Sequence, residues 1–320
     1  MAVTSAGALG PFRMALPSLR DNDLPSSCCP HLASGIRDNQ TLRKLNLSYN
    51  KLGGDEFSDL MAALPTSRIE ELDLQNNNLP SSCCPHLASG IRNNQTLRKL
   101  HLYDNNLGGD EFSDLMAALP TSRIEELHLQ NNNLPSSCCP HLASGIRNNQ
   151  TLRKLHLSAN RLGGDEFSVL MAALPTSRIE ELLLGNIDLP SSCCPHLASG
   201  IRNNQTLRKL HLYNNKLGGD EFSDLMAALP TSRIEELRLG SSNLPSSCFP
   251  HLASGIRNNQ TLRKLHLYNN KLGGDEFSDL MVALPTSRIE ELDFMGELSK
   301  EQKQQLEALK RCRPDMKIEY

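Results

Sequence analysis

The chain has 320 residues, of which 38% are hydrophobic and only 4% aromatic, and its formal net charge is −3. Charges of both signs are dispersed along it, so the composition lacks the basic footprint of a protein that binds nucleic acid or an anionic membrane surface. No stretch approaches the roughly 18 consecutive apolar residues of a transmembrane helix. The first residues also lack the basic-then-apolar order of a secretory signal.

The N-terminal segment, residues 1–23, only partly matches the rest of the chain. Residues 14–20 look like the end of a repeat, but three residues, Asp21 to Asp23, stand where later copies have ten. We expect either that residues 1–23 fold back to cover the first edge of the structure or that the chain is part of something longer.

Residues 24–296 are built from a repeated sequence. The string LPSSCC or LPSSCF begins at positions 24, 79, 134, 189 and 244, a fixed step of 55 residues. Each copy divides into two half-repeats, such as 41–68 and 69–95, and both fit the pattern L-x-x-L-x-L-x-x-N-x-L. This periodicity indicates a solenoid of five double repeats, in which each unit packs only on its neighbours.

Each half-repeat is predicted to contain a short strand followed by a helix. Leu45 and Leu47 alternate with polar residues, as in a half-buried strand, and residues 57–64 place apolar side chains on one helix face. We expect Asp55 to cap this helix and Ser81 or Ser82 to cap the helix of the next half-repeat.

An asparagine ends most of the strand patterns, where its short amide side chain can reach the turning backbone. Stacked repeats would align these side chains in a ladder that is interrupted at Ile187 and Ser242. The expected members of the ladder are Asn50, Asn77, Asn105, Asn132, Asn160, Asn215 and Asn270.

Strands and helices that alternate through right-handed crossovers predict an α/β fold with one parallel sheet. Parallel strands lie about 4.8 Å apart, whereas helices with their side chains are about 10 Å wide. The stack must therefore bend into a horseshoe, with the sheet on the concave face and the helices on the convex face. Arg43-Lys44 beside Glu70-Glu71 begins an alternation that predicts ion pairs between adjacent strands.

Residues 297–320 depart from the repeat. Ser299 and Gln302 have the spacing of a capping box, and the residues around them place leucines on one face and charged groups on the other. Pro314 and Asp315 then precede a predicted final strand at 316–320. We expect this segment to be the polar C-terminal cap that a solenoid needs.

The paired half-repeats resemble the ribonuclease-inhibitor-type leucine-rich repeat proteins. The matching residues of one copy are Leu97, Leu100, Leu102, Asn105, Leu107, Phe112, Leu115 and Leu119, and those of the other half-repeat are Leu79, Cys84, Leu87 and Ile91. This resemblance implies protein recognition on the concave face. The family includes nuclease inhibitors, the sensing domains of NOD-like immune receptors and the activating protein of the nuclear-transport GTPase.

The ten cysteines are interpreted as reduced thiols, and the second cysteine of each adjacent pair as a core residue. Equivalent cysteines recur two half-repeats apart, about 10 Å or more, whereas bridged Cα atoms lie within roughly 7 Å. Phe249 stands where the other copies have the second cysteine of the pair, which indicates a buried apolar position. The spacing does not match a zinc site, so no metal or cofactor is expected, and reduced thiols favour a cytoplasmic location.

Histidine occurs in two settings. His31, His86, His141, His196 and His251 are expected on the solvated outer helices, and His101, His128, His156, His211 and His266 on the inner face of the sheet. Four of the inner histidines recur on every second strand, about 10 Å apart, which favours a contact role over metal binding. A pH-sensitive interface is one hypothesis.

Differences between the copies concentrate in the strands. Over residues 24–243 the four copies vary at 11 of 55 columns, and nine of these fall in the segments aligned with 46–51 and 73–78. We interpret them as a diversified surface for a protein ligand, because solvated helix faces stay constant. The expected contact residues are Asn46, Ser48, Tyr49, Asp73, Gln75, His101, Tyr103, Asp104, His128, Gln130, His156, Ser158, Leu183, His211, Tyr213, Asn214, Arg238, His266, Tyr268, Asn269 and Asp293.

No pattern of catalytic residues stands out from the repeat, and we expect no enzyme. The leading hypothesis is a monomeric protein-binding module, in innate recognition or as an inhibitor. A regulator of a small GTPase, like the nuclear-transport activator, and a structural scaffold remain as alternatives. Nucleic acid and membranes are not expected as partners.

Overall fold

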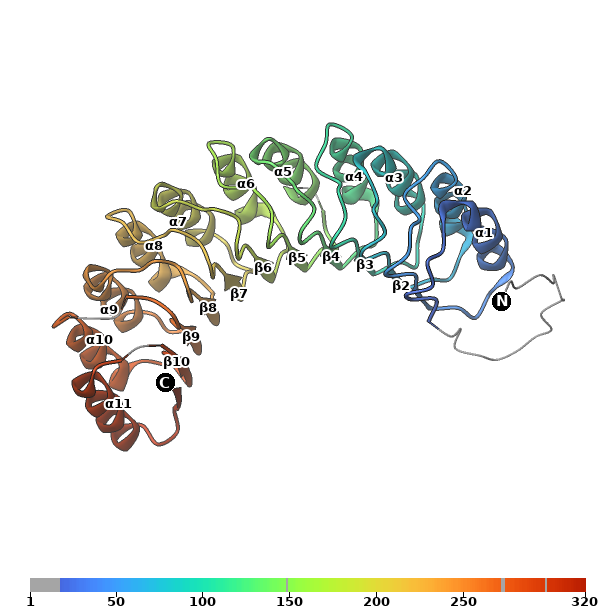
Figure 1. Ribbon diagram of the computed structural model, residues 1–320. Helices are drawn as coiled ribbons and strands as arrows, with labels where there is room; N and C mark the ends of the chain where they lie inside the picture. The colour runs from blue at the N-terminus through green and yellow to red at the C-terminus, as the bar shows by residue number, and fades with distance from the viewer. Residues whose placement is uncertain (1–17, 148, 272–273, 297) are drawn as a thin grey trace.

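The computed structural model describes residues 18–147, 149–271, 274–296 and 298–320. Across these residues, eleven short strands form one parallel sheet in which each strand pairs with the next along the chain, from β1 to β11. Figure 1 shows the strands along the inner edge of an arch and the helices along its outer edge. The predicted α/β leucine-rich repeat solenoid is therefore confirmed.

The strands of this sheet are three residues long. They are β1 Lys44–Asn46, β2 Glu71–Asp73, β3 Lys99–His101, β4 Glu126–His128, β5 Lys154–His156, β6 Glu181–Leu183, β7 Lys209–His211, β8 Glu236–Arg238, β9 Lys264–His266, β10 Glu291–Asp293 and β11 Lys317–Glu319.

Helices of two alternating kinds cover the outer side. One kind begins at a cysteine or phenylalanine before Pro-His-Leu: α1 Cys29–Asp38, α3 Cys84–Arg92, α5 Cys139–Arg147, α7 Cys194–Arg202 and α9 Phe249–Arg257. The other begins at the phenylalanine of the GGDEF sequence: α2 Phe57–Ala63, α4 Phe112–Ala118, α6 Phe167–Ala173, α8 Phe222–Ala228 and α10 Phe277–Ala283. The helix α11, Lys300–Cys312, follows the last repeat.

The repeat pattern builds one continuous core between sheet and helices. Leu47, Phe57 and Cys29 are fully buried, and so are their equivalents along the arch. Burying a leucine or phenylalanine side chain contributes roughly 1.5–3 kcal/mol, so stacked copies stabilise one another although no copy closes a core alone. Phe249 packs edge-on against Phe277, with ring centroids 5.9 Å apart, which confirms that this column is apolar core.

Two helix caps predicted from the sequence are wrong. Ser81–Cys83 forms a 3-10 turn, and α3 begins without a side-chain cap, as does α2. The hydroxyl of Ser81 instead donates to Glu111 Oε2 at 2.6 Å. The first amides of α2 find partners within their own turn, since Phe57 N–H donates to the Gly54 carbonyl. A side-chain cap is therefore not needed.

The asparagine ladder is present, but its two half-repeats use it differently. Asn105 Oδ1 accepts from the amides of Asn77 and Leu79, and its Nδ2 donates to the carbonyls of Leu74 and Leu102. Asn50, Asn160, Asn215 and Asn270 repeat this pattern of acceptance and donation.

The second half-repeat needs only the donor group of the ladder side chain. Asn132 Nδ2 donates to Leu102 O and Gln130 O, while its buried Oδ1 has no partner among the described residues, as at Asn77. Both predicted interruptions fall in this half-repeat. Ser242 Oγ donates to the Leu212 carbonyl in place of an amide, and Ile187 is fully buried.

The cysteines are free thiols, and nine of them lie in or beside the core. Burial raises the pKa of Cys29 to about 12 and that of Cys83 to about 11, so these thiols stay protonated and unreactive near neutral pH. Cys312, on α11, is the exposed one. The described residues contain no group of three or more His, Cys, Asp and Glu side chains that could hold a metal ion.

Both ends of the sheet are extended by non-repeat segments. At the C-terminal end, β11 pairs with β10, and Ser299 and Gln302 form the predicted capping box of α11. At the other end, the Leu19 amide donates to the Asn46 carbonyl of β1, and the Asp21 amide donates to the Ser48 carbonyl just after this strand. Residues 18–23 therefore lie against the first edge, whereas residues 1–17 fall outside the described residues. The domain boundaries remain predictions.

Candidate protein-binding surface

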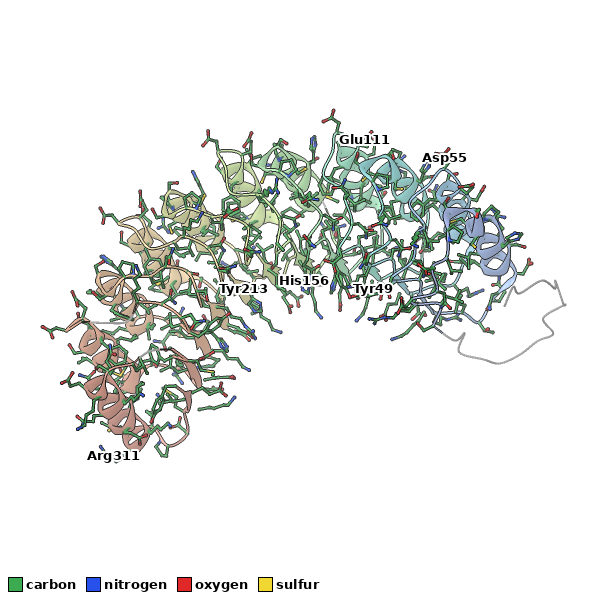
Figure 2. The ribbon with its side chains drawn as sticks, viewed as in Figure 1. Tyr49, Asp55, Glu111, His156, Tyr213 and Arg311 are labelled. Atoms are coloured by element: carbon green, nitrogen blue, oxygen red, sulfur yellow. The ribbon has the colours of Figure 1, made fainter. Side chains whose placement is uncertain are left out.

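The inner face of the arch is made by the side chains that alternate with the buried leucines of each strand. The register aligns equivalent residues, so Asp73, His101, His128, His156 and Leu183 form one row across β2 to β6. Figure 2 shows Tyr49, His156 and Tyr213 on this inner side, and Asp55 and Glu111 on the outer side.

A ladder of ion pairs runs beside this row, as the sequence predicts. Lys44 Nζ lies 2.9 Å from Glu71 Oε2, Lys99 pairs with Glu126 at 3.2 Å, and Arg43 pairs with Glu70 at 3.3 Å. The register places lysine and glutamate on alternate strands throughout. Most of these side chains are well exposed, so each pair contributes only about 0.2–1 kcal/mol.

Three histidines form a contiguous cluster that the sequence analysis missed. His128, on β4, lies between the predicted alternate-strand pair His101 and His156, with ring centroids 4.4 Å and 4.2 Å from theirs. The expected separation of about 10 Å holds only for every second strand. The adjacent positions of β3, β4 and β5 in the register carry the signal that identifies this cluster.

Burial lowers the pKa of three of the inner histidines. It lowers the pKa of His128 to about 3, with the neighbouring His156 and His101 adding to the effect, and that of His211 to about 4, where Arg238 contributes. Burial also lowers the pKa of His156, although the Glu181 carboxylate opposes it. His128 and His211 therefore do not titrate between pH 5.5 and 8, the range of the predicted pH-sensitive interface.

The predicted contact residues divide by exposure. Ser48 is fully buried, so its proposed contact role is wrong: its hydroxyl donates to Asn46 Oδ1 within the turn. Others have under a tenth of their surface exposed and act mainly as supports: Gln75, His156, Ser158, His211 and Asp293. The rest are partly or fully exposed: Asn46, Tyr49, Asp73, His101, Tyr103, Asp104, His128, Gln130, Leu183, Tyr213, Asn214, Arg238, His266, Tyr268 and Asn269.

Two tyrosines lean over glycines of the preceding strand segment. A Cβ atom built on Gly185 would overlap the ring of Tyr213, and one built on Gly240 would overlap the ring of Tyr268. Gly185 and Gly240 occupy the column that holds glutamine in the first two copies. Variation in this column is therefore coupled to ring packing, which the comparison of copies alone does not reveal.

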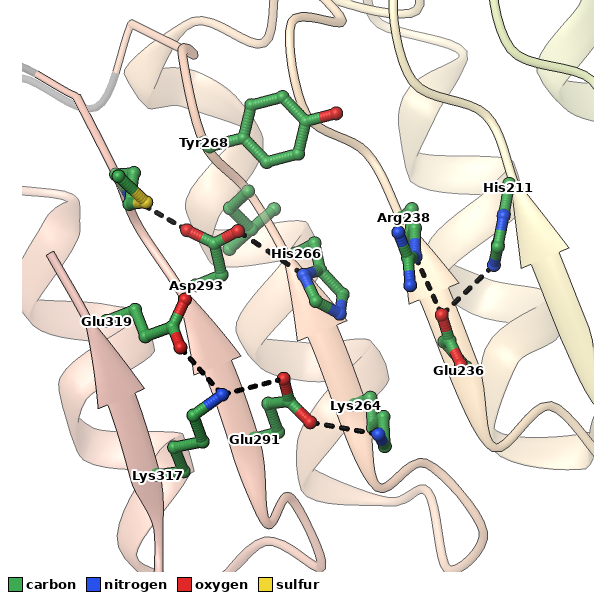
Figure 3. Close-up of polar contacts among 12 residues, drawn as sticks. His211, Glu236, Arg238, Lys264, His266, Tyr268, Glu291, Asp293, Lys317 and Glu319 are labelled. Atoms are coloured by element: carbon green, nitrogen blue, oxygen red, sulfur yellow. Dashed lines mark hydrogen bonds and ion pairs between the residues drawn. The ribbon is translucent and has the colours of Figure 1, made fainter.

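Arg238 is the one residue of permanent positive charge in the row that contains His211 and Asp293. Its Nε lies 2.6 Å from Glu236 Oε1, and the same oxygen is 3.0 Å from His211 Nε2 (Figure 3). Burial raises the pKa of Glu236, but the hydrogen bond and charge of Arg238 outweigh it, so the pKa lies below its usual value. The carboxylate stays ionised and orients the guanidinium.

The strand ends carry a second polar surface, and of its lining residues only Asp104 was among the predicted contact residues. Asn76, Asp104 and Asn131 have φ values of 49°, 56° and 50°, in the left-handed region that asparagine and aspartate tolerate. They line an open cavity of about 640 Å³ together with other asparagines of the same loops. The recurrence of Asn and Asp at the position of Asn76 in most half-repeats was the sequence signal for this left-handed turn. Tyr49 and Ala159 adopt the same conformation without that signal.

Constancy of the outer face has partly structural causes. A Cβ on Gly53 would overlap the Asn78 carbonyl, and Glu56 accepts from Ser26 at 2.6 Å, so the GGDEF sequence is fixed by packing. His86 and Arg92 are also constant among the copies, yet their side chains make no hydrogen bond or ion pair among the described residues. The contrast between a constant outer face and a variable inner face therefore rests on residues such as His86 and Arg92, which packing does not fix.

Comparisons with known proteins agree with this architecture. The family model "Leucine Rich repeat" matches residues 38–55, 93–110 and 148–165. The chain is 30% identical to a pig (Sus scrofa) ribonuclease inhibitor over 306 residues, covering 92% of this chain and 67% of that protein. It is 33% identical over 313 residues to the rat (Rattus norvegicus) "NACHT, LRR and PYD domains-containing protein 3", covering 93% of this chain but only 30% of that protein.

The paired half-repeats, buried cysteine columns and inner parallel sheet define a leucine-rich repeat protein. The chain belongs to the ribonuclease-inhibitor-type family of leucine-rich repeat proteins. Among solved structures, a yeast Rad7 and Elc1 complex matches with a TM-score of 0.49 and 15% identity, over 89% of this chain and 77% of that one. No helix in the described ranges is long and apolar enough to cross a membrane.

Proposed function

We propose that the chain is a non-catalytic module that binds a protein ligand on the inner face of its arch. The observation that carries this proposal is the placement of the variable residues: Asp73, His128, Leu183, Arg238 and Asp293 are equivalent positions on alternate strands of one surface. The scaffold beneath them is nearly identical from copy to copy.

The chemistry of this face suits protein recognition. Tyr103, Tyr213 and Tyr268 are partly exposed, and tyrosine and arginine are enriched among the residues that dominate binding energy. The continuous core holds the strands in place, so little conformational entropy is lost on binding. We propose a monomer in the cytoplasm, where the free cysteines stay reduced.

The relatives suggest two contexts for such binding, since one is an inhibitor of ribonuclease and the other is a NACHT, LRR and PYD protein. An inhibitor would occlude the working surface of an enzyme, whereas a receptor region would report a ligand to other domains. We propose one of these two roles, inhibition or innate recognition, and both require the same inner face.

Affinity capture with matched surface variants tests this proposal. The wild-type chain, an inner variant (Tyr213→Ala with Arg238→Ala) and an outer variant (His86→Ala with Arg92→Ala) would be immobilised, and a captured protein purified for direct binding measurements. We expect the inner variant to bind that protein at least about tenfold more weakly, and the outer variant to bind normally. Circular dichroism melts check that both variants fold.

Equal binding by the inner variant, or a loss confined to the outer variant, would assign recognition to another surface and refute the proposal. Stimulated GTP hydrolysis by the captured partner would favour a GTPase regulator instead. A wild-type chain that captures no protein above a blank support would leave only the scaffold role.

A further inference from the structure

Arg238, on the inner face, has an oriented guanidinium whose terminal N–H donors are not used in hydrogen bonds among the described residues. Arg238 uses Nε for Glu236, whereas its two Nη groups contact no hydrogen-bond acceptor among the described residues. Its side chain is 41% exposed. The outer edge of this guanidinium thus presents paired N–H donors to the solvent, in the geometry that binds both oxygens of a carboxylate.

The groups around Arg238 make this edge a fixed feature. Glu236 is only 10% exposed and holds the guanidinium on one side, supported by His211. Figure 3 shows this trio beside β9 and β10, whose residues His266 and Asp293 are joined at 3.3 Å. The arginine side chain therefore loses less freedom on binding than an unsupported one.

The surroundings of the edge are aromatic and apolar. The ring of Tyr268 lies over Gly240, two residues along the chain from Arg238, and the ring of Tyr213 lies over Gly185. Leu183 is partly exposed two strands away, and Met295, next to the last repeat strand, is 56% exposed. A ligand that covers these side chains would exclude water from the arginine, which strengthens an ion pair made there.

On the basis of the proposed function, we infer that Arg238 receives a carboxylate side chain, Asp or Glu, from the protein ligand, with apolar ligand residues packed on Tyr213 and Tyr268. The free protein balances the arginine charge with Glu236. The pair therefore produces no net positive potential that would attract a polyanion such as nucleic acid from a distance, and recognition by Arg238 depends on close contact. An acidic group beside apolar residues of a folded protein fits this condition.

The chain supplies its own matched substitutions at this position. The equivalent residues of other copies are Asp73, His128 and Leu183, so the strand accepts each of these side chains. Arg238→Leu removes the guanidinium and keeps an apolar surface that the fold already tolerates. Arg92→Leu, on the outer side of the arch, removes an equal charge as a control.

The experiment measures binding of two synthetic peptides, Leu-Glu-Tyr-Gly-Ser and its glutamine counterpart Leu-Gln-Tyr-Gly-Ser, both with blocked ends. Binding is followed by NMR through the Nε–H resonance of Arg238, assigned by its absence in Arg238→Leu, and through the neighbouring backbone amides. We expect the glutamate peptide to bind wild type and Arg92→Leu about tenfold more tightly than the glutamine peptide. The preference should vanish in Arg238→Leu.

Equal binding of both peptides to wild type, or a glutamate preference that survives in Arg238→Leu, overturns the inference. So does competition by a DNA duplex at the same amides, or an Arg238-dependent self-association seen by light scattering, which would assign the edge to a nucleic acid or to a second copy. A captured partner that needs the inner face but binds Arg238→Leu normally refutes the carboxylate contact alone. Loss of all inner-face dependence refutes the proposed function itself.

Discussion

The ring of Tyr213 lies over the backbone of Gly185, in the strand segment before it, in space that any side chain at 185 would fill. Glutamine stands at the equivalent position in the first copies, and there Gln75 donates instead to Tyr49 and Asp104. The identity of residue 185 therefore decides how the next tyrosine presents its ring to a ligand.

Gly185→Gln is expected to displace the Tyr213 ring with little loss of stability, under about 1 kcal/mol, because the overlapping atoms lie at the free end of the ring. Fluorotyrosine NMR, with the resonance assigned by Tyr213→Phe, would show a shifted Tyr213 signal. In Gly35→Gln the added side chain enters open space, so the signal should not move. An unchanged signal in Gly185→Gln would contradict this packing of the ring on the glycine.

The two kinds of ladder asparagine predict unequal costs. Asn105→Ala leaves two buried amides and two carbonyls without their hydrogen-bond partner, and each such group costs about 1–3 kcal/mol when left unpaired. Asn132→Ile loses only donor bonds, and the chain itself carries Ile187 at that position. Urea unfolding should find Asn105→Ala less stable than Asn132→Ile by at least about 2 kcal/mol. Equal midpoints would show that the ladder is uniform.

Ala159 is a strained position that can be relieved. Its φ is 58°, whereas the equivalent Asp104 and Asn214 belong to types that tolerate the left-handed region. Ala159→Asn is expected to stabilise the protein by about 0.5–1 kcal/mol, seen as a higher midpoint in a thermal melt. Ala159→Val, which is worse suited to positive φ, should lower the midpoint. A stabilising valine would argue against strain at this turn.

Stability should fall as the pH drops below the ordinary histidine pKa. The folded-state pKa of His128 is about 3, well below the unfolded value near 6.5, so the unfolded chain binds more protons between these values. The contribution is complete above pH 6.5 and is lost progressively towards pH 3. His156 and His211 act in the same direction.

Carboxylates add to this loss only at lower pH. The pKa of Glu181, which faces His156, is held below its usual value because Lys209 and His156 outweigh burial, so it protonates below about pH 4.5. Melting temperatures measured between pH 7 and 5 therefore isolate the histidine contribution. His128→Gln should flatten this slope, whereas His86→Gln, on an outer helix, should not. A slope unaffected by His128→Gln would place the titration elsewhere.

The regular part of the fold was predictable because its signals are local. The alternation of Leu45 and Leu47 and the helical spacing from Phe57 define strand and helix within one half-repeat, and identical copies must stack identically. One error lies where a polar side chain bonds across half-repeats. Ser81 looks like a helix cap in sequence, but its partner Glu111 lies 30 residues further on.

The candidate site was predictable as a face but not in its details. The row of variable residues follows from strand alternation, while exposure depends on neighbours in three dimensions. Ser48 and Tyr103 occupy equivalent positions of consecutive copies, yet Ser48 is fully buried and the larger tyrosine reaches the surface. The pairing of Arg238 with Glu236, two residues away, likewise requires the side-chain conformations.

The alternating ion pairs also determine how such an array can lengthen. Removing or inserting a single half-repeat would set lysine beside lysine, as Lys44 beside Lys99, where Glu71 now separates them. It would also place two ladder asparagines of the same kind side by side, although the two kinds now alternate and hydrogen-bond differently. Gene duplication in steps of 55 residues avoids both penalties, so the double unit is the smallest module that evolution, or an engineer, can add without redesigning a junction.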